Sequence, residues 1–334
     1  MNFRKATVWT ILAAVMSMSQ MQCSKSDAPI RDEEASNGSE PRVKLVAKYP
    51  PGTYEMIQIQ DMTTKGTVRA GDRKQKISSK QKMTQWVDIN VTPAAAGSTK
   101  LAMDFKRIRQ ETTGGPASGV IDTSDPASLS GNPGAKVFSA LLDAEITMDC
   151  DADGKVSNVS GMSAIWDRIG RQDPQMRQMA QQLKKTLGDK AMGKMISMSQ
   201  DFMPKEPVGA GAVWYADFSM PIPMAGDMGC EAKCKLIELK TNPAGENIAV
   251  IEMKARMTSK GGETTQIGPG SMKIDALKMT IKGRMDLNTD NGMMSKQSMD
   301  IDGSMSVKVE AQGQTITTDA EITGTQSTTF TKTK

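Results

Sequence analysis

With 334 residues, of which 24% are charged and 38% hydrophobic, the chain has the composition of a globular protein, and this excludes a wholly disordered or multi-span membrane protein. It contains no histidine, which excludes Ser-His-Asp and Cys-His catalysis, histidine-bound zinc or haem, and a histidine pH switch. The formal net charge is +4, or +2 without Arg4 and Lys5, so no nucleic-acid partner is expected.

The first 22 residues are predicted to be an export signal peptide. A positive start is followed by the uncharged residues 6–19, whose apolar centre is too short for a transmembrane helix. Two processing sites compete: cleavage after Ser19, or lipidation of Cys23 as in bacterial lipoproteins. Residues 23–41 are polar and are predicted to form a disordered tether. We expect an exported envelope protein, facing the periplasm or in the outer membrane, with a lipid anchor if Cys23 is modified.

Residues 42–334 are predicted to form a single β-rich domain. Apolar and polar residues alternate through 42–113 and 205–334, and short glycine turns join the strands of the second region, as in an antiparallel meander. Residues 114–134 are rich in Gly, Pro, Ser and Asp and indicate a loop. Residues 135–204 are predicted to mix a hairpin with helices. The fold class is therefore α+β and β-dominated, with a curved antiparallel sheet packed against a central helical segment.

Methionines recur at helical spacing in the central segment. Met176, Met179 and Leu183 fall on one face of a predicted helix, and Met192 and Met195 lie on the next one. Methionine is flexible and fills irregular cores, but it also lines adaptable binding surfaces. The five residues are therefore either core or the lining of a groove for an apolar ligand.

Asp149, Asp151 and Asp153, followed by Gly154, form the first half of a calcium-binding loop. The twelfth position of that loop is Ser160, where a bidentate glutamate belongs, and strands are expected on both sides. A hairpin turn explains the same residues equally well. The three aspartates are therefore only a weak calcium candidate, and no metal or cofactor is predicted.

Cys150, Cys230 and Cys234 are candidates for a disulfide, because export places them in an oxidising compartment. Cys230 and Cys234 lie about 13 Å apart if they share a strand, which is too far for a bridge. A structural disulfide is therefore expected, and if one of them pairs with Cys150, the third cysteine is left over as an odd thiol.

Several segments resemble an uncharacterised family of exported, β-rich bacterial envelope proteins, a domain of unknown function. The segments that carry the resemblance are Trp86–Ile89 with Met103–Ile108, Gly154–Gly161, Pro207–Gly209 and Val213–Trp214. Together they span most of residues 42–334. The resemblance implies a β-rich envelope protein and supplies no site residues.

The chain contains no nucleophile elbow, P-loop or dinucleotide-binding motif. We therefore expect that the protein is not an enzyme. The function expected is that of a non-catalytic binder or carrier of an apolar or amphiphilic ligand. The alternative is a structural lipoprotein, or one that binds an envelope protein, without a small-molecule ligand.

Overall fold

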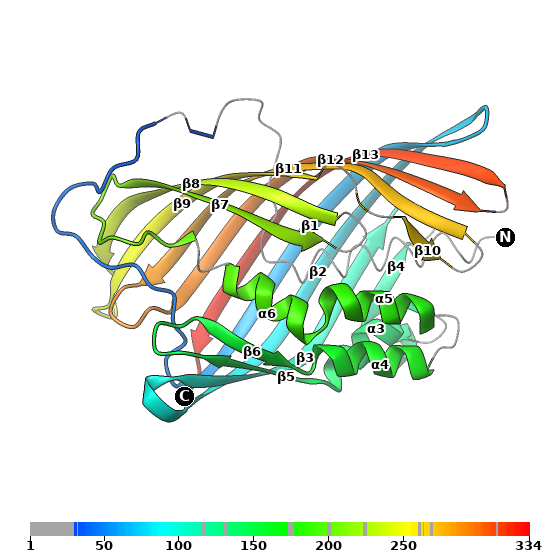
Figure 1. The fold of residues 1–334 in the computed structure, drawn as a ribbon. Coiled ribbons are helices and arrows are strands. Elements are labelled where there is room, and N and C mark those ends of the chain that lie inside the picture. Colours follow the sequence, from blue (N-terminus) through cyan, green and yellow to red (C-terminus); the bar gives the residue numbers. More distant parts are fainter. Residues whose placement is uncertain are drawn as a thin grey trace.

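The structure is a computed structural model, and it describes residues 30, 31, 33–114, 118–129, 133–172, 177–198, 202–222, 226–259, 262, 264–267, 270–311 and 313–334. These residues form one antiparallel sheet of 13 strands with helices gathered on one side of it (Figure 1). The predicted α+β, β-dominated fold with a curved antiparallel sheet is confirmed.

The neighbouring strands follow the order β6-β5-β3-β2-β1-β13-β12-β11-β9-β8-β7, with β4 beside β3 and β10 beside β11. Their bounds are β1 (Gly52–Ala70), β2 (Arg73–Pro93), β3 (Thr99–Thr113), β4 (Gly119–Asp122), β5 (Glu145–Cys150), β6 (Val156–Ser160), β7 (Val213–Ile222), β8 (Gly226–Thr241), β9 (Asn247–Ser259), β10 (Thr265–Ile267), β11 (Gly270–Asn288), β12 (Met294–Ala311) and β13 (Gln314–Lys332). The predicted meander is β7 to β13, and its last strand pairs with β1 in the middle of the sheet. The two β regions of the sequence therefore form one continuous surface.

The helices are α2 (Pro126–Leu129), α3 (Pro133–Leu142), α4 (Met162–Gln172), α5 (Arg177–Leu187) and α6 (Asp189–Met198), with a 3-10 turn η1 (Ala95–Gly97). Trp166 donates a hydrogen bond from Nε1 to the carbonyl oxygen of Leu187 over 3.2 Å, which ties α4 to the end of α5. Helix α6 contacts both β6 and β7, the two edge strands of the sheet. The sheet is therefore curled far enough for one helix to reach both edges (Figure 1). Among the described helices, none combines the length and the apolar character needed to traverse a bilayer.

The predicted loop 114–134 contains short regular elements where it is described, namely β4, α2 and the start of α3. Asp122 accepts hydrogen bonds from Arg107 Nε at 3.0 Å and Nη2 at 2.5 Å, and another from Ser124 Oγ at 2.7 Å. The bonds from Arg107, followed by those from Ser124, hold the pKa of Asp122 well below its usual range. Hydrogen bonds between polar side chains hold this segment in place. Because its apolar residues do not recur at regular spacing, the hydrophobic pattern did not predict its strand and helices.

The described part of the predicted tether 23–41 lies against β7 and β8. Ser36 and Val213 exchange backbone hydrogen bonds of 2.8 and 3.0 Å, and the Glu33 carboxylate contacts Lys233 Nζ at 2.9 Å. Further along, the backbone N–H of Lys48 donates to the carbonyl of Gly292 in the β11–β12 turn at 2.8 Å. The residues that were predicted to form a tether therefore supply backbone and charged partners to strands β7 and β8.

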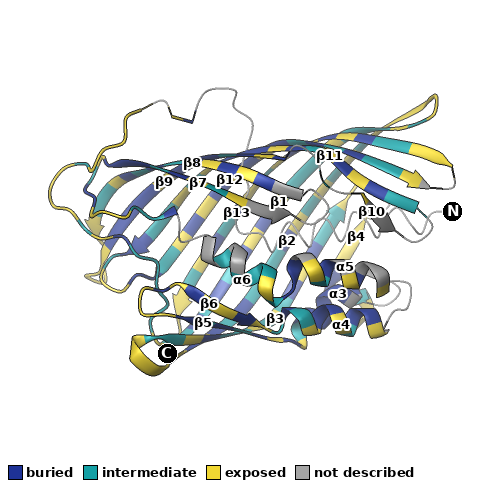
Figure 2. Cartoon of the chain, viewed as in Figure 1, coloured by how far each residue is buried: buried dark blue, intermediate teal, exposed yellow. Residues whose placement is uncertain are grey.

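Buried and exposed residues alternate along the strands, so that one face of the sheet is apolar (Figure 2). The buried apolar residues form two clusters. The first, called the helix-side cluster, joins β1, β2, β3, β5 and β6 to α3, α4 and α5. The second, called the meander cluster, is built from β7, β8, β9, β11, β12 and β13 with Leu45, Phe202 and Val208.

Candidate functional site

A belt of polar side chains lies on the inward face of the sheet, where the central strands β1 and β13 meet. It consists of six glutamines and one threonine, each between 2% and 8% exposed: Gln58, Gln60, Gln85, Gln110, Gln297, Gln326 and Thr328. Gln58 and Gln60 have the same strand phase as Tyr54 and Met56, which are buried in the helix-side cluster. The belt therefore faces the interior of the curled sheet.

The strand register brings the belt residues together in two adjacent rows. In the first row, Gln58 pairs with Gln85 on one side and with Thr328 on the other, and Thr328 pairs with Gln297. Opposed residues on one face of an antiparallel pair have Cβ atoms about 4.5–5.5 Å apart. These four side chains are therefore immediate neighbours across β2, β1, β13 and β12.

The second row places Gln60 directly opposite Gln326, with Met83 and Met299 as the next residues on either side. Gln110 lies beyond Met83 on β3. Because Met83 belongs to the helix-side cluster and Met299 to the meander cluster, the belt lies where the two apolar clusters adjoin.

Five buried amide atoms of the belt have no hydrogen-bond partner among the described residues. They are the Nε2 atoms of Gln58, Gln60 and Gln326 and the Oε1 atoms of Gln110 and Gln326. An unpaired buried polar group costs about 1–3 kcal/mol. Five such atoms would cost roughly 5–15 kcal/mol, which equals the whole stability of an ordinary domain. The belt is therefore a set of donors and acceptors that requires further partners.

Methionine dominates the apolar face beside the belt. The meander cluster contains seven buried methionines: Met228, Met253, Met257, Met272, Met279, Met299 and Met305. Inward-facing glycines lie beneath several methionine side chains: a Cβ at Gly283 would stand 3.2 Å from Met299 Cγ, and one at Gly303 would stand 3.0 Å from Met279 Cγ. The unbranched thioethers therefore lie across the sheet, and their three rotatable bonds allow this surface to change shape.

The predicted helical groove is only partly within the described residues. Leu183 is 4% exposed and belongs to the helix-side cluster, and Met192 packs against that cluster from its edge. Met176 lies outside the described residues, as do the side chains of Met179 and Met195. The two described side chains therefore contribute to the core, and the inward sheet face is the better candidate for a ligand surface.

The three aspartates of the weak calcium candidate lie in and beside the β5–β6 turn. Asp151 Oδ1 accepts the backbone N–H groups of Asp153 at 3.0 Å and Lys155 at 2.8 Å, and Asp149 accepts Asn158 Nδ2 at 3.2 Å. Within the described chain, no three His, Cys, Asp or Glu residues are grouped to hold a metal ion. The Asp151 and Asp149 side chains therefore stabilise the β5–β6 hairpin through these hydrogen bonds.

The three cysteines are buried, and no disulfide joins them. Cys150 ends β5 in the helix-side cluster, whereas Cys230 and Cys234 lie on β8 in the meander cluster. The predicted bridge is absent because the two strands belong to different halves of the sheet. Burial raises the pKa of Cys150 to about 11 and that of Cys234 to about 12. The lipidation candidate Cys23 lies outside the described residues.

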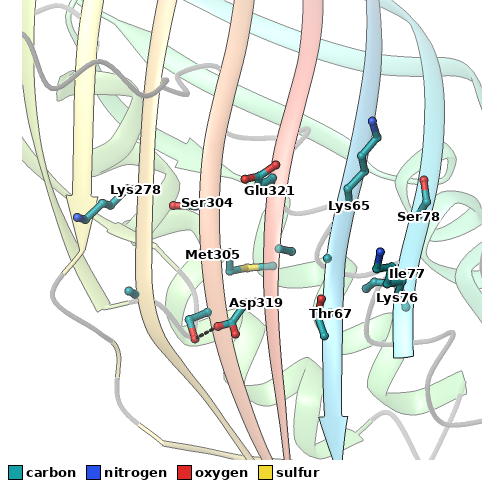
Figure 3. Close-up of a pocket in the computed structure, with 14 residues that line it drawn as sticks. Lys65, Thr67, Lys76, Ile77, Ser78, Lys278, Ser304, Met305, Asp319 and Glu321 are labelled. Carbon is teal, nitrogen blue, oxygen red and sulfur yellow. Dashed lines mark hydrogen bonds between the residues drawn. The ribbon is translucent and has the colours of Figure 1, made fainter. Parts of the chain in front are cut away.

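A pocket of about 930 Å³ is present on the outward face of the same central strands (Figure 3). Asp319 and Glu321, which line it, are exposed and alternate with the buried Ala320, so this pocket opens on the side opposite to the belt. Asp319 accepts a hydrogen bond from Ser306 Oγ at 2.9 Å and also pairs with Arg69, and the Arg69 contact is the main cause of its lowered pKa.

The outward pocket mixes both signs of charge. Lys65 and Lys278 point away from each other, and the carboxylate of Glu321 lies between them (Figure 3). On this described surface, the charged side chains of one sign do not converge on a common point. We therefore regard the inward belt as the candidate site.

The belt was not predicted from the sequence, although a signal was present. Gln58 and Gln60 occupy the inward phase of a strand, directly after Tyr54 and Met56, where an apolar residue is the expected choice. An amide at such a position indicates either a satisfied polar network or a site.

Among solved structures, a lipovitellin structure on lipid–protein interactions is similar over 85% of this chain and 25% of its own, with 8% identity and a TM-score of 0.42. The chain thus spans about a quarter of that protein's length. The outer membrane channel from Pseudomonas putida F1 is similar over 84% of this chain and 97% of its own, with 7% identity and a TM-score of 0.24. A mutant of Rh. blastica porin is similar over 80% of this chain and 99% of its own, with 8% identity and a TM-score of 0.22. These values are too low to indicate a shared function.

No curated protein matches the sequence. Residues 96–294 match the model of a family of unknown function, DUF6263, and this range is more than half of the 334 residues. The range includes four of the five segments that carry the resemblance, Met103–Ile108, Gly154–Gly161, Pro207–Gly209 and Val213–Trp214, and excludes Trp86–Ile89. The chain therefore belongs to this family of unknown function, DUF6263.

Proposed function

We propose that the protein is a non-catalytic binder or carrier of an amphiphilic ligand held against the inward face of the curled sheet. The observation that carries this proposal is the presence of buried, unpaired amide atoms next to a methionine-rich apolar surface. A ligand with an apolar part and a polar part would complement both features at once. Water alone would supply partners for the amides but would not complement the apolar surface.

The methionines support a carrier more than a rigid scaffold. A core that only has to be filled is best specified by leucine, isoleucine and valine, whose rotamers are well defined. Methionine repacks around different apolar shapes at low cost, and it is over-represented at promiscuous binding surfaces. Seven methionines on one inward face therefore favour an adaptable ligand surface.

A cell-envelope location completes the proposal. The signal-like first 22 residues support export, and Cys23 followed by a polar segment supports attachment to a membrane through a lipid. In that position the protein would meet amphiphiles as they leave or enter a bilayer. A partner protein is less well supported, because the exposed large apolar residues in the described chain, Ile59, Val120 and Ile237, lie on three different strands.

The first test is native mass spectrometry of the full chain, purified without detergent from cells of its own host. We expect a fraction with added mass, and the added molecule should be extractable with organic solvent and identifiable as an amphiphile. The extracted protein should then bind a fluorescent fatty-chain probe. Protein that carries no added mass and binds no such probe would overturn the proposal in favour of a structural role.

A matched pair of variants separates a ligand surface from a filled core. Ala255 is 1% exposed on the inward face of β9, and Thr258 is exposed on the outward face of the same strand. Ala255→Phe should weaken probe binding with little loss of stability if a ligand lies on this face, whereas in a filled core it should cost about 1–3 kcal/mol. Thr258→Phe should leave binding unchanged.

A further inference from the structure

We infer that the glutamine belt recognises the polar head group of the amphiphile, and that this head group is uncharged and carries hydroxyl or carboxamide groups. This inference rests on the proposed function and names the ligand class that the same site accepts. The five unpaired amide atoms, Gln58 Nε2, Gln60 Nε2, Gln110 Oε1 and both polar atoms of Gln326, define the recognition surface.

The belt offers donors and acceptors together. Three of its unpaired atoms are amide nitrogens, which donate, and two are amide oxygens, which accept. Gln326 has one of each and is 2% exposed, so it is the centre of the site. A hydroxyl or carboxamide group both donates and accepts and would satisfy such a mixture. A carboxylate or phosphate dianion only accepts, and it would leave the amide oxygens without partners.

Charge leads to the same conclusion. Asp122 is the one charged side chain among the buried described residues, and it is engaged by Arg107. A buried anionic head group would have no counter-ion at the belt, and burial of an unpaired charge is strongly unfavourable. The neutral belt therefore discriminates against ionised head groups as well as accepting uncharged ones.

The position of the belt also suits a head group with an attached chain. Gln326 is flanked by Met299 of the meander cluster, and Gln58 is two residues from Met56 of the helix-side cluster on β1. A hydrocarbon chain that leaves the belt in either direction would pass directly onto apolar surface. The head group would be fixed at the centre of the sheet, while the methionines adjust to the chain.

The test compares two probes of equal chain length at pH 8, a monoacylglycerol and the corresponding ionised fatty acid. Binding of each to the lipid-free full chain is measured by displacement of a fluorescent fatty-chain probe. The wild type should prefer the monoacylglycerol. Gln326→Leu and Gln60→Leu should each weaken monoacylglycerol binding about tenfold, the effect of one lost hydrogen bond to the ligand, and should not weaken fatty-acid binding.

Gln75→Leu is the matched control, because Gln75 is an exposed glutamine on β2 and the same substitution is made. Gln75→Leu should retain the preference of the wild type. If Gln326→Leu and Gln60→Leu also retain it, or if the wild type binds both probes equally, the inference about the belt is overturned while the proposed function stands. If the wild type binds no amphiphile, the proposed function itself fails. Circular dichroism of each variant shows that a loss of binding does not reflect unfolding.

Discussion

Gln326→Leu is expected to raise the stability of the ligand-free protein, which is unusual for a substitution at a site only 2% exposed. Both polar atoms of the Gln326 amide are unpaired among the described residues, and each such atom costs about 1–3 kcal/mol. Leucine has a similar size and no polar atom, and it would face Met299 on β12. We therefore expect a gain of about 1–3 kcal/mol, after allowing for imperfect packing of the new side chain.

The assay is urea unfolding of the lipid-free protein, with the midpoint and the slope compared between variants. Gln75→Leu, at an exposed position, should change the unfolding free energy by less than about 0.5 kcal/mol. A loss of more than about 1 kcal/mol in Gln326→Leu, at unchanged slope, would refute the reasoning. It would mean that the amide is satisfied within the folded chain and contributes to its stability.

Three further substitutions or modifications test other parts of the structure. Asp122→Asn should lower the unfolding free energy by about 1–3 kcal/mol at pH 7. Because the folded pKa of Asp122 is lowered, its contribution is complete above the unfolded value of about 3.9 and is lost as the pH falls through the folded value. The difference from the wild type should therefore narrow below about pH 4, and urea titrations that show a constant difference down to about pH 2 would contradict this. Gly154→Ala should lower the unfolding free energy more than Gly245→Ala does in the same assay. Both glycines have a positive φ, 83° and 84°, so the backbone strain of the two substitutions is alike. A Cβ at Gly154 would collide with the carbonyl oxygen of Ala47, whereas a Cβ at Gly245 meets nothing within 4 Å. Equal losses of unfolding free energy in the two variants would show that the backbone at Ala47 moves away to accommodate the new Cβ. Cys150 and Cys234 should react with iodoacetamide at pH 8 at least about a hundredfold more slowly in the folded protein than in urea, because burial raises the pKa of each thiol to about 11 and 12. Peptide mapping by mass spectrometry measures this, and rapid labelling would show that the inward face is open to solvent.

The meander was predictable because its signal is local. In β11, Leu277, Met279 and Ile281 recur with a period of two and are all buried, and glycines mark several of the turns. Alternation of this kind identifies both the strand and its inward face without any knowledge of partners. The α+β class follows from the same pattern together with the helical spacing of the central segment.

The pairing of β1 with β13 was not predictable in this way. Tyr54 pairs with Lys332 across nearly the whole chain, and no feature of either strand specifies its partner. The belt depends on this pairing, because Gln60 and Gln326 are neighbours only in that register. The inward phase of Gln58 and Gln60 could have marked each glutamine as unusual, but the sequence could not show that six of them meet. The N-terminal contact of Glu33 with Lys233 is invisible for the same reason.

The belt and the apolar face are linked through folding as well as through binding. A ligand that pairs with the belt removes an energetic penalty from the folded state only, since the unfolded chain satisfies its amides with water. Its binding therefore stabilises the fold by an amount that grows with the logarithm of ligand concentration over Kd. Leucine at the same positions would give a more stable empty protein and a smaller gain on binding. In the proposed carrier, glutamine at the centre of an otherwise apolar face would therefore tie the stability of the sheet to its occupancy, and the loaded state would differ in stability from the empty one.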